Sequence, residues 1–127
     1  MAIRTELTVR LQNMPGALSR LCQALADERV NILALSLEPT GTLRLLADNP
    51  VHAAGVLRDR HYHIEERDVL YTVAPNDPGS LARIAALLAA EGVNLEYLYT
   101  TSVEDSTMAG IVAGVPDAAR ASAAAGL

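Results

Sequence analysis

Apolar and polar residues alternate at the start of the chain, over residues 3–11. This period of two predicts a half-buried β-strand. From about residue 15 to residue 29 the apolar residues recur at helical spacing instead, which predicts an amphipathic helix. Residues 31–39 and 42–48 have the composition of two further strands, and the turn signal Pro-Thr-Gly separates them.

One more helix and one more strand complete this first segment. Asn49 and Pro50 suit the N-cap and the first turn of a helix that ends near Arg60. Residues 61–67 then alternate again and predict a last strand. The order of elements over residues 1–68 is therefore βαββαβ.

The same pattern occurs a second time. A shift of 63 residues aligns QNMPGALSRL (12–21) with PNDPGSLARI (75–84), and it gives 11 identities over positions 13–35. An internal duplication is the economical explanation. The second copy predicts strands at 69–74, 94–102 and 106–113, and helices at 78–91 and 116–125.

The second copy is shorter than the first. Its closing strand would need residues 124–130, but the sequence ends at Leu127. We therefore expect the second module, residues 69–127, to lack most of its last strand. The open sheet edge would then be covered by another chain or by missing sequence, because exposed edges invite pairing.

Each copy carries the loop N-x-P-G-x-L between its first strand and its first helix, with Pro15 expected in the first helical turn. The free N–H groups and the partial positive charge at a helix start favour a carboxylate. Eighteen residues after each loop asparagine comes another, Asn31 or Asn94, whose amide can both donate and accept. Each asparagine also suits a cap or a turn, but the repeated spacing favours a ligand contact.

The loop, the helix and the following V-N-I/L motif, inside βαββαβ modules, resemble the ACT domain, the amino-acid-binding regulatory module of biosynthetic enzymes. In particular, the chain resembles stand-alone tandem ACT proteins, to which no catalytic domain is attached. The resemblance implies an α+β protein of two ferredoxin-like modules, 1–68 and 69–127, packed side by side in a continuous eight-stranded sheet. An effector amino acid would bind between the loop of one unit and the neighbouring unit. The implied ligand-binding residues are Asn13, Met14, Pro15, Gly16, Ala17, Leu18 and Asn31 in the first copy, and Asn76, Asp77, Pro78, Gly79, Ser80, Leu81 and Asn94 in the second.

The sequence departs from the family pattern in two respects. Where serine-binding ACT domains carry a histidine two residues before the loop asparagine, this chain has Leu11 and Ala74, which argues against serine. Asp77 also replaces Met14 in the second loop. Its carboxylate could occupy the anion site itself or select the ammonium end of a ligand. One competent site and one altered site is therefore an open alternative.

Charge and cysteine content restrict the partners. The net charge is −5, and no run of basic residues is present to neutralise phosphates or anionic lipid. Nucleic acid and membranes are therefore not expected partners. The single cysteine, Cys22, excludes an internal disulfide and lies on the apolar stripe of the first helix, where we expect core packing. No apolar run approaches membrane-spanning length, so we expect a cytoplasmic protein.

Catalysis and metal binding find no support in the sequence. His61 and His63 would share one face of the expected strand with Glu65, but no further ligands complete a metal site. No nucleophile with a base, phosphate loop or dinucleotide motif is present, so we expect no enzymatic activity and no cofactor.

Tyrosines mark one face of the second copy. Tyr71 on its first strand, and Tyr97 and Tyr99 on the next, match first-copy positions that face away from the helices. This indicates sheet-on-sheet packing between chains, unless the register is shifted by one residue. RNA binding through such a face would need basic character as well, which the second copy lacks.

These observations predict a non-catalytic regulatory protein that binds a small free amino acid. We expect a homo-oligomer, most simply a homodimer, and an effect on a separate biosynthetic enzyme. The alternative is a structural, protein-interaction module that assembles with a partner without binding a ligand.

Overall fold

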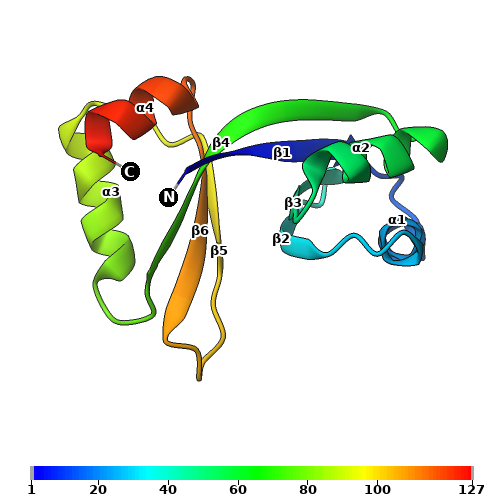
Figure 1. Ribbon diagram of the computed structural model, residues 1–127, viewed down its shortest axis with the longest axis horizontal. Helices are drawn as coiled ribbons and strands as arrows, with labels where there is room; N and C mark the ends of the chain where they lie inside the picture. The colour runs from blue at the N-terminus through cyan, green and yellow to red at the C-terminus, as the bar shows by residue number, and fades with distance from the viewer. Residues whose placement is uncertain (1, 127) are drawn as a thin grey trace. The chain divides into compact units, whose positions relative to one another are not determined.

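The computed structural model describes residues 2–126 (Figure 1). It divides into two compact units. The first unit is Thr5–Arg67, and the second combines the start of the chain, through Arg4, with the chain from Asp68 onward. Among the described residues, no helix is both long and apolar enough to span a membrane.

The first unit has the predicted βαββαβ order. Its elements are β1 (Ala2–Arg10), α1 (Ala17–Asp27), β2 (Ile32–Leu37), β3 (Thr42–Ala47), α2 (Pro50–Asp59) and the beginning of β4 (Ile64–Pro75). The hydrogen-bonded strand order is β2-β3-β1-β4. Leu7 and Val9 lie opposite Leu45 and Leu43 across an antiparallel register. These side chains form the fully buried centre of a core that α1 and α2 complete.

Local sequence signals explain where the helices of this unit start. The side chain of Asn49 accepts a hydrogen bond of 3.1 Å from the His52 N–H, so its predicted role as N-cap is confirmed. The expected start of α1 at Pro15 is wrong, because the helix begins at Ala17. Gly16, with φ of 85°, is the N-cap, and this left-handed conformation excludes the residues before it from the helix. Cys22 is partly buried on α1.

The second unit contains α3 (Ser80–Ala90), β5 (Tyr97–Thr101), β6 (Met108–Gly114) and α4 (Ala118–Ala125) besides most of β4. The strand order is β4-β6-β5, and α3 and α4 lie together on one side of these strands in Figure 1. Its core is small and rich in alanine around Leu70 and Leu88. Asp117 caps α4 by accepting a hydrogen bond from the Arg120 N–H at 3.0 Å.

The expected eight-stranded sheet is wrong, because the sheet among the described residues has six strands. Two expected strands, 61–67 and 69–74, are in fact one continuous strand, β4. It starts only at Ile64, and His61 lies in the preceding turn with φ of 69°. The expectation that His61 and His63 share a strand face is therefore wrong. The chain takes a left-handed turn after α2 before it becomes extended.

The missing closing strand of the second unit is confirmed as far as the described residues extend, since α4 follows β6 and no strand follows α4. The neighbour of β4 on that side is β1. Arg4 of β1 belongs to the second unit, and its guanidinium carbon lies 5.0 Å from the centre of the Tyr71 ring. At Tyr71, the edge expected to need another chain is thus met by Arg4 from the start of the same chain.

The tyrosine face has the predicted register. Tyr71 and Tyr99 flank Val112 on opposite sides, whereas Leu70 and Ala113 belong to the core beneath the helices. The rings of Tyr97 and Tyr99 stack at 6.4 Å between centres. Gly114 leaves room for this arrangement, because a Cβ there would overlap the Tyr97 ring.

Candidate functional site

The first loop is a tight turn that ends at an open helix start. The Met14 N–H donates to the Gln12 carbonyl at 2.9 Å, and the Ala17 N–H donates to the Met14 carbonyl at 3.3 Å. The next two N–H groups, of Leu18 and Ser19, have no acceptor among residues 2–126. They point along the helix axis with the positive end of the helix dipole behind them.

A groove of about 420 Å³ lies directly in front of this helix start. One wall is the loop itself, and the other is the turn between β2 and β3, which contributes Glu38 and Pro39. The Glu38 carboxylate is ion-paired with Arg44 and remains partly exposed. Exposed Met14 and Leu37 supply apolar surface. The lining residues are Leu11, Gln12, Asn13, Met14, Gly16, Ala17, Leu18, Ser19, Leu37, Glu38, Pro39 and Gly41.

This groove can hold a small zwitterion. The helix start attracts a carboxylate, the Glu38 carboxylate opposite attracts an ammonium group, and Asn13 and Gln12 offer amides that donate and accept. Five of the predicted first-copy residues line it, and Pro15 does not.

Asn31 lies elsewhere. It follows the end of α1, whereas the loop precedes its start, and eleven helical residues span about 16 Å. Its backbone N–H donates to the Asp48 carboxylate at 3.1 Å, and its carbonyl accepts from the Asp48 N–H at 3.0 Å. One unit alone therefore does not bring Asn31 to the ligand groove.

The second loop uses its asparagine differently. The Asn76 side-chain amide donates to the carbonyls of Val103 and Ser106, both at 3.0 Å. The Asn76 N–H also donates to the Thr107 carbonyl at 3.0 Å. This residue ties the loop to the turn between β5 and β6, so its amide N–H groups are already occupied.

Asp77 places a carboxylate at the start of α3. Its Oδ1 accepts a hydrogen bond of 2.7 Å from the Ser80 hydroxyl, and the Arg83 guanidinium lies 3.4 Å away. The hydrogen bond from Ser80 is the main cause that lowers the pKa of Asp77; desolvation opposes it, and the charge and hydrogen bond of Arg83 add to the lowering. Gly79, the N-cap with φ of 95°, repeats the geometry of Gly16. The second loop thus carries its own anion.

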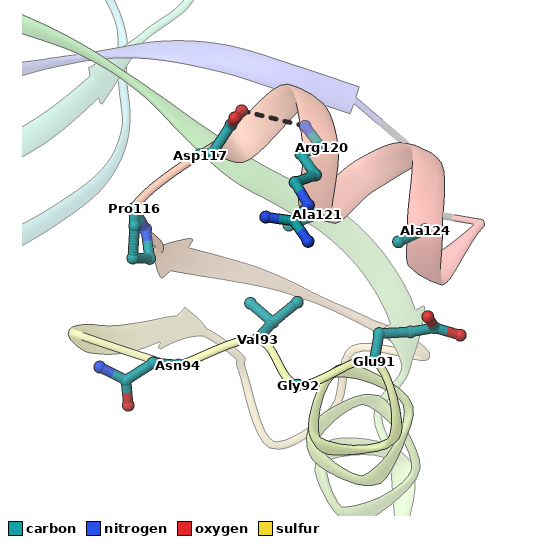
Figure 2. Close-up of a pocket in the computed structure, with 9 residues that line it drawn as sticks. All are labelled: Glu91, Gly92, Val93, Asn94, Pro116, Asp117, Arg120, Ala121 and Ala124. Carbon is teal, nitrogen blue, oxygen red and sulfur yellow. Dashed lines mark hydrogen bonds between the residues drawn. The ribbon is translucent and has the colours of Figure 1, made fainter.

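Asn94 lies in a separate pocket of about 270 Å³ between the end of α3 and α4. Figure 2 shows Arg120 reaching from α4 toward Val93, while Asn94 and Glu91 lie across the space on the connection after α3. Pro116 immediately precedes the N-cap of α4, and the residue at the equivalent position before the N-cap of α2 is Asp48. Proline has no N–H and no carboxylate, so the two hydrogen bonds that join Asn31 to Asp48 have no counterpart here.

Comparisons with known proteins agree with this architecture. A model of the ACT domain matches residues 5–50, and a model of the AHAS small subunit-like ACT domain matches residues 70–125. The chain belongs to the ACT-domain family. The predicted fold class, two ACT modules of α+β type, is thereby confirmed.

Solved structures with the same fold cover nearly all of the tandem ACT chain. Protein BT0572 from Bacteroides thetaiotaomicron is 30% identical with a TM-score of 0.87, over 96% of this chain and 85% of that one. The regulatory subunit of aspartate kinase from Thermus flavus is 16% identical with a TM-score of 0.68, over 98% and 90%. Aspartokinase III from E. coli, in complex with lysine and aspartate, is 14% identical with a TM-score of 0.56, over 87% and 28%. No curated protein matches the chain.

Sequence reasoning missed several residues of the ACT loops. Glu38 and Gln12 line the first groove, and Arg83 contacts Asp77 in the second loop. Glu38 gave no signal, because it comes from a distant turn. Arg83 did give one: it repeats Arg20 at the same place in the duplication. Among the described residues no three His, Cys, Asp or Glu side chains cluster to hold a metal ion.

Proposed function

We propose that this tandem ACT protein is a non-catalytic regulatory protein that binds a free amino acid at the loop of its first ACT domain. The observation that carries the proposal is the groove in front of α1. It combines two free backbone N–H groups at the helix start with a carboxylate, Glu38, on the opposite wall.

In this proposal the ligand carboxylate accepts hydrogen bonds from Leu18 and Ser19, where the helix dipole adds to the attraction. The ligand ammonium faces Glu38, and Asn13 closes the polar contacts. The side chain of the bound amino acid lies against Met14 and Leu37, which are 48% and 45% exposed. Such apolar surface favours an amino acid with an apolar portion over a very polar one.

Regulation would follow from a difference in ligand affinity between two states. We expect these states to differ in how a homodimer, or a separate biosynthetic enzyme, is engaged. Asn31 lies at the far end of α1, away from the groove of its own chain. In a dimer, Asn31 of a second copy would instead complete the groove from outside. The aspartate kinases that share the fold give this scheme its precedent, since E. coli aspartokinase III was crystallised with lysine and aspartate.

A thermal-shift screen against the twenty amino acids tests the proposal. A ligand at 100 times its dissociation constant adds about 2.7 kcal/mol of stability, which is a rise of several degrees in a chain of this size. Calorimetry with the amino acid that raises the melting temperature should then show weaker binding to the Asn13→Ala variant. Silence across all twenty amino acids, or unchanged affinity in this variant and in Asn31→Ala, would contradict the assignment.

The alternative function is assembly with a partner protein without a ligand. The second loop favours it for the second domain, because Asp77 already supplies the anion at the start of α3. Mass measurement by size-exclusion chromatography separates the two functions. A regulatory protein changes its oligomeric state, or its affinity for its enzyme, when the amino acid is added, and an assembly module does not.

A further inference from the structure

A third pocket, of about 280 Å³, also lies beside the start of α1 and shares Leu11, Gln12 and Ala17 with the amino acid groove. Three arginines reach it from three separate elements: Arg10 ends β1, Arg20 lies in α1, and Arg60 is the C-cap of α2. His61 and His63 add two groups that become cationic on protonation. The lining consists of Arg10, Leu11, Gln12, Ala17, Arg20, Arg60, His61, Tyr62 and His63, and it contains no aspartate or glutamate.

The acidic residues near the pocket leave much of this charge unbalanced. Arg60 reaches Asp27 only at 4.0 Å, with both side chains about half exposed. Arg10 donates to the Thr40 carbonyl at 3.5 Å, which neutralises no charge. Arg20 has no ion-pair partner among residues 2–126. On the histidine side, His63 lies 3.9 Å from Glu65, and both side chains are largely exposed.

Like charges gathered in one concave place repel one another unless an anion joins them. The guanidinium fork is suited to the paired oxygens of phosphate, and it stays charged at every physiological pH. The buried Leu11 and Ala17 form an apolar part of the wall. The size of the pocket restricts the occupant to a small molecule.

We propose that this pocket binds a small, multiply charged anion of the phosphate class, separately from the amino acid groove. The part of the second domain that the structure describes keeps only Arg83, the repeat of Arg20, out of the three arginines. Val73 stands at the repeat position of Arg10, and the C-cap of α4 is Gly126 where α2 has Arg60. The anion site is therefore a property of the first domain alone, and it would let a phosphorylated metabolite and an amino acid act on one ACT domain.

The test is calorimetric titration of the full chain with inorganic phosphate at constant ionic strength, with chloride as the reference anion. We expect one saturable site per chain. The Arg60→Ala and Arg20→Ala variants should bind about tenfold more weakly, because each loses charge-assisted hydrogen bonds. Arg60→Lys keeps the charge without the fork and should fall between. The control is Arg120→Ala, which removes one exposed positive charge from the second domain and should leave binding unchanged.

Three results would overturn the proposal. They are the absence of saturable phosphate binding to the wild-type chain, an equal loss of affinity in Arg120→Ala, and tighter binding of a dicarboxylate of the same charge. A phosphate monoester titrated in parallel distinguishes free phosphate from a phosphorylated metabolite. Unliganded melting temperatures identify any variant that fails to fold. Because the two arginines belong to different elements, each variant tests the site independently of the other.

Discussion

The two ACT loops have the same glycine-capped backbone, but different side chains lie beside their helix starts. In both, a glycine with positive φ caps the helix, and an arginine follows four residues later with its guanidinium near that glycine. In the second loop the sequence adds Asp77 and Ser80, which place a protein carboxylate beside the helix start, bonded to the Ser80 hydroxyl and near the Arg83 guanidinium. In the first, Met14 and Ala17 stand at those places and leave the helix start open. Both copies thus keep the glycine-capped helix start, and only the second copy places a protein carboxylate beside it.

The difference extends to the charge of each half. Residues 1–67 carry eight arginines and eight acidic residues, whereas residues 68–127 carry two arginines and seven acidic residues. The whole net charge of −5 therefore resides in the second half. An anionic ligand therefore meets no net repulsion from the residues of the first half, whereas the net negative charge of the second half repels it.

Converting the first loop into the second is expected to have the largest effect. In the Met14→Asp, Ala17→Ser double variant, Arg20 can pair with the new carboxylate as Arg83 pairs with Asp77. We expect the amino acid affinity to fall by a factor of at least about ten, because ligand and protein carboxylates then compete for one helix start. Calorimetry measures this, and Met14→Leu with Ala17→Ser is the uncharged control. Equal affinities in the two double variants would show that the helix start does not hold the ligand.

Replacing the loop asparagines should separate a structural from a functional role. Asn76→Ala removes two hydrogen bonds to the β5–β6 turn, which should cost about 1–2 kcal/mol of unfolding free energy. Asn13→Ala removes none within residues 2–126 and should leave stability unchanged while it weakens ligand binding. Urea denaturation of both variants provides the comparison. The opposite ranking of stabilities would contradict the roles assigned to the two side chains.

The smallest expected effect is the contribution of Asp77 to the pH dependence of stability. The folded pKa of Asp77 is lowered below its ordinary value of 3.8, first by the Ser80 hydrogen bond. Its contribution to stability is therefore present above 3.8 and is lost as the pH falls through the lowered folded value. We expect Asp77→Asn to melt slightly below wild type at neutral pH. The difference should shrink in acid below that window; a difference that grows there would reverse the sign of the linkage.

Much of the fold was predictable because its signals are local. Periodicity located nearly every helix and strand, and Asn49 acts as the cap that its position before Pro50 predicts. The start of α1 was misplaced because Pro15 is common in first turns, and only the backbone of Gly16 shows that the helix has not yet begun. The merging of two expected strands into β4 had a signal that was overlooked, since no glycine or proline interrupts Ile64–Ala74.

The candidate sites were predictable only in part. The repeated loop identified one wall of the amino acid groove, and the alternative that Asp77 supplies its own anion was visible in the sequence. The opposite wall was not visible, because Glu38 reaches the groove through the turn between two strands. The basic pocket joins Arg10, Arg20 and Arg60, whose sequence separations show no pattern that indicates a shared site.

The sequence by itself determined the duplicated ACT fold, the two glycine-capped helix starts and the exchange of Met14 for Asp77. These depend on residues close together in the chain, whose periodicity and backbone preferences act locally. Only the tertiary structure decided what faces each loop: Glu38 before α1, the β5–β6 turn holding Asn76, and the start of β1 beside β4. Such contacts depend on strand order and turn direction, which arise when distant segments bury a common core.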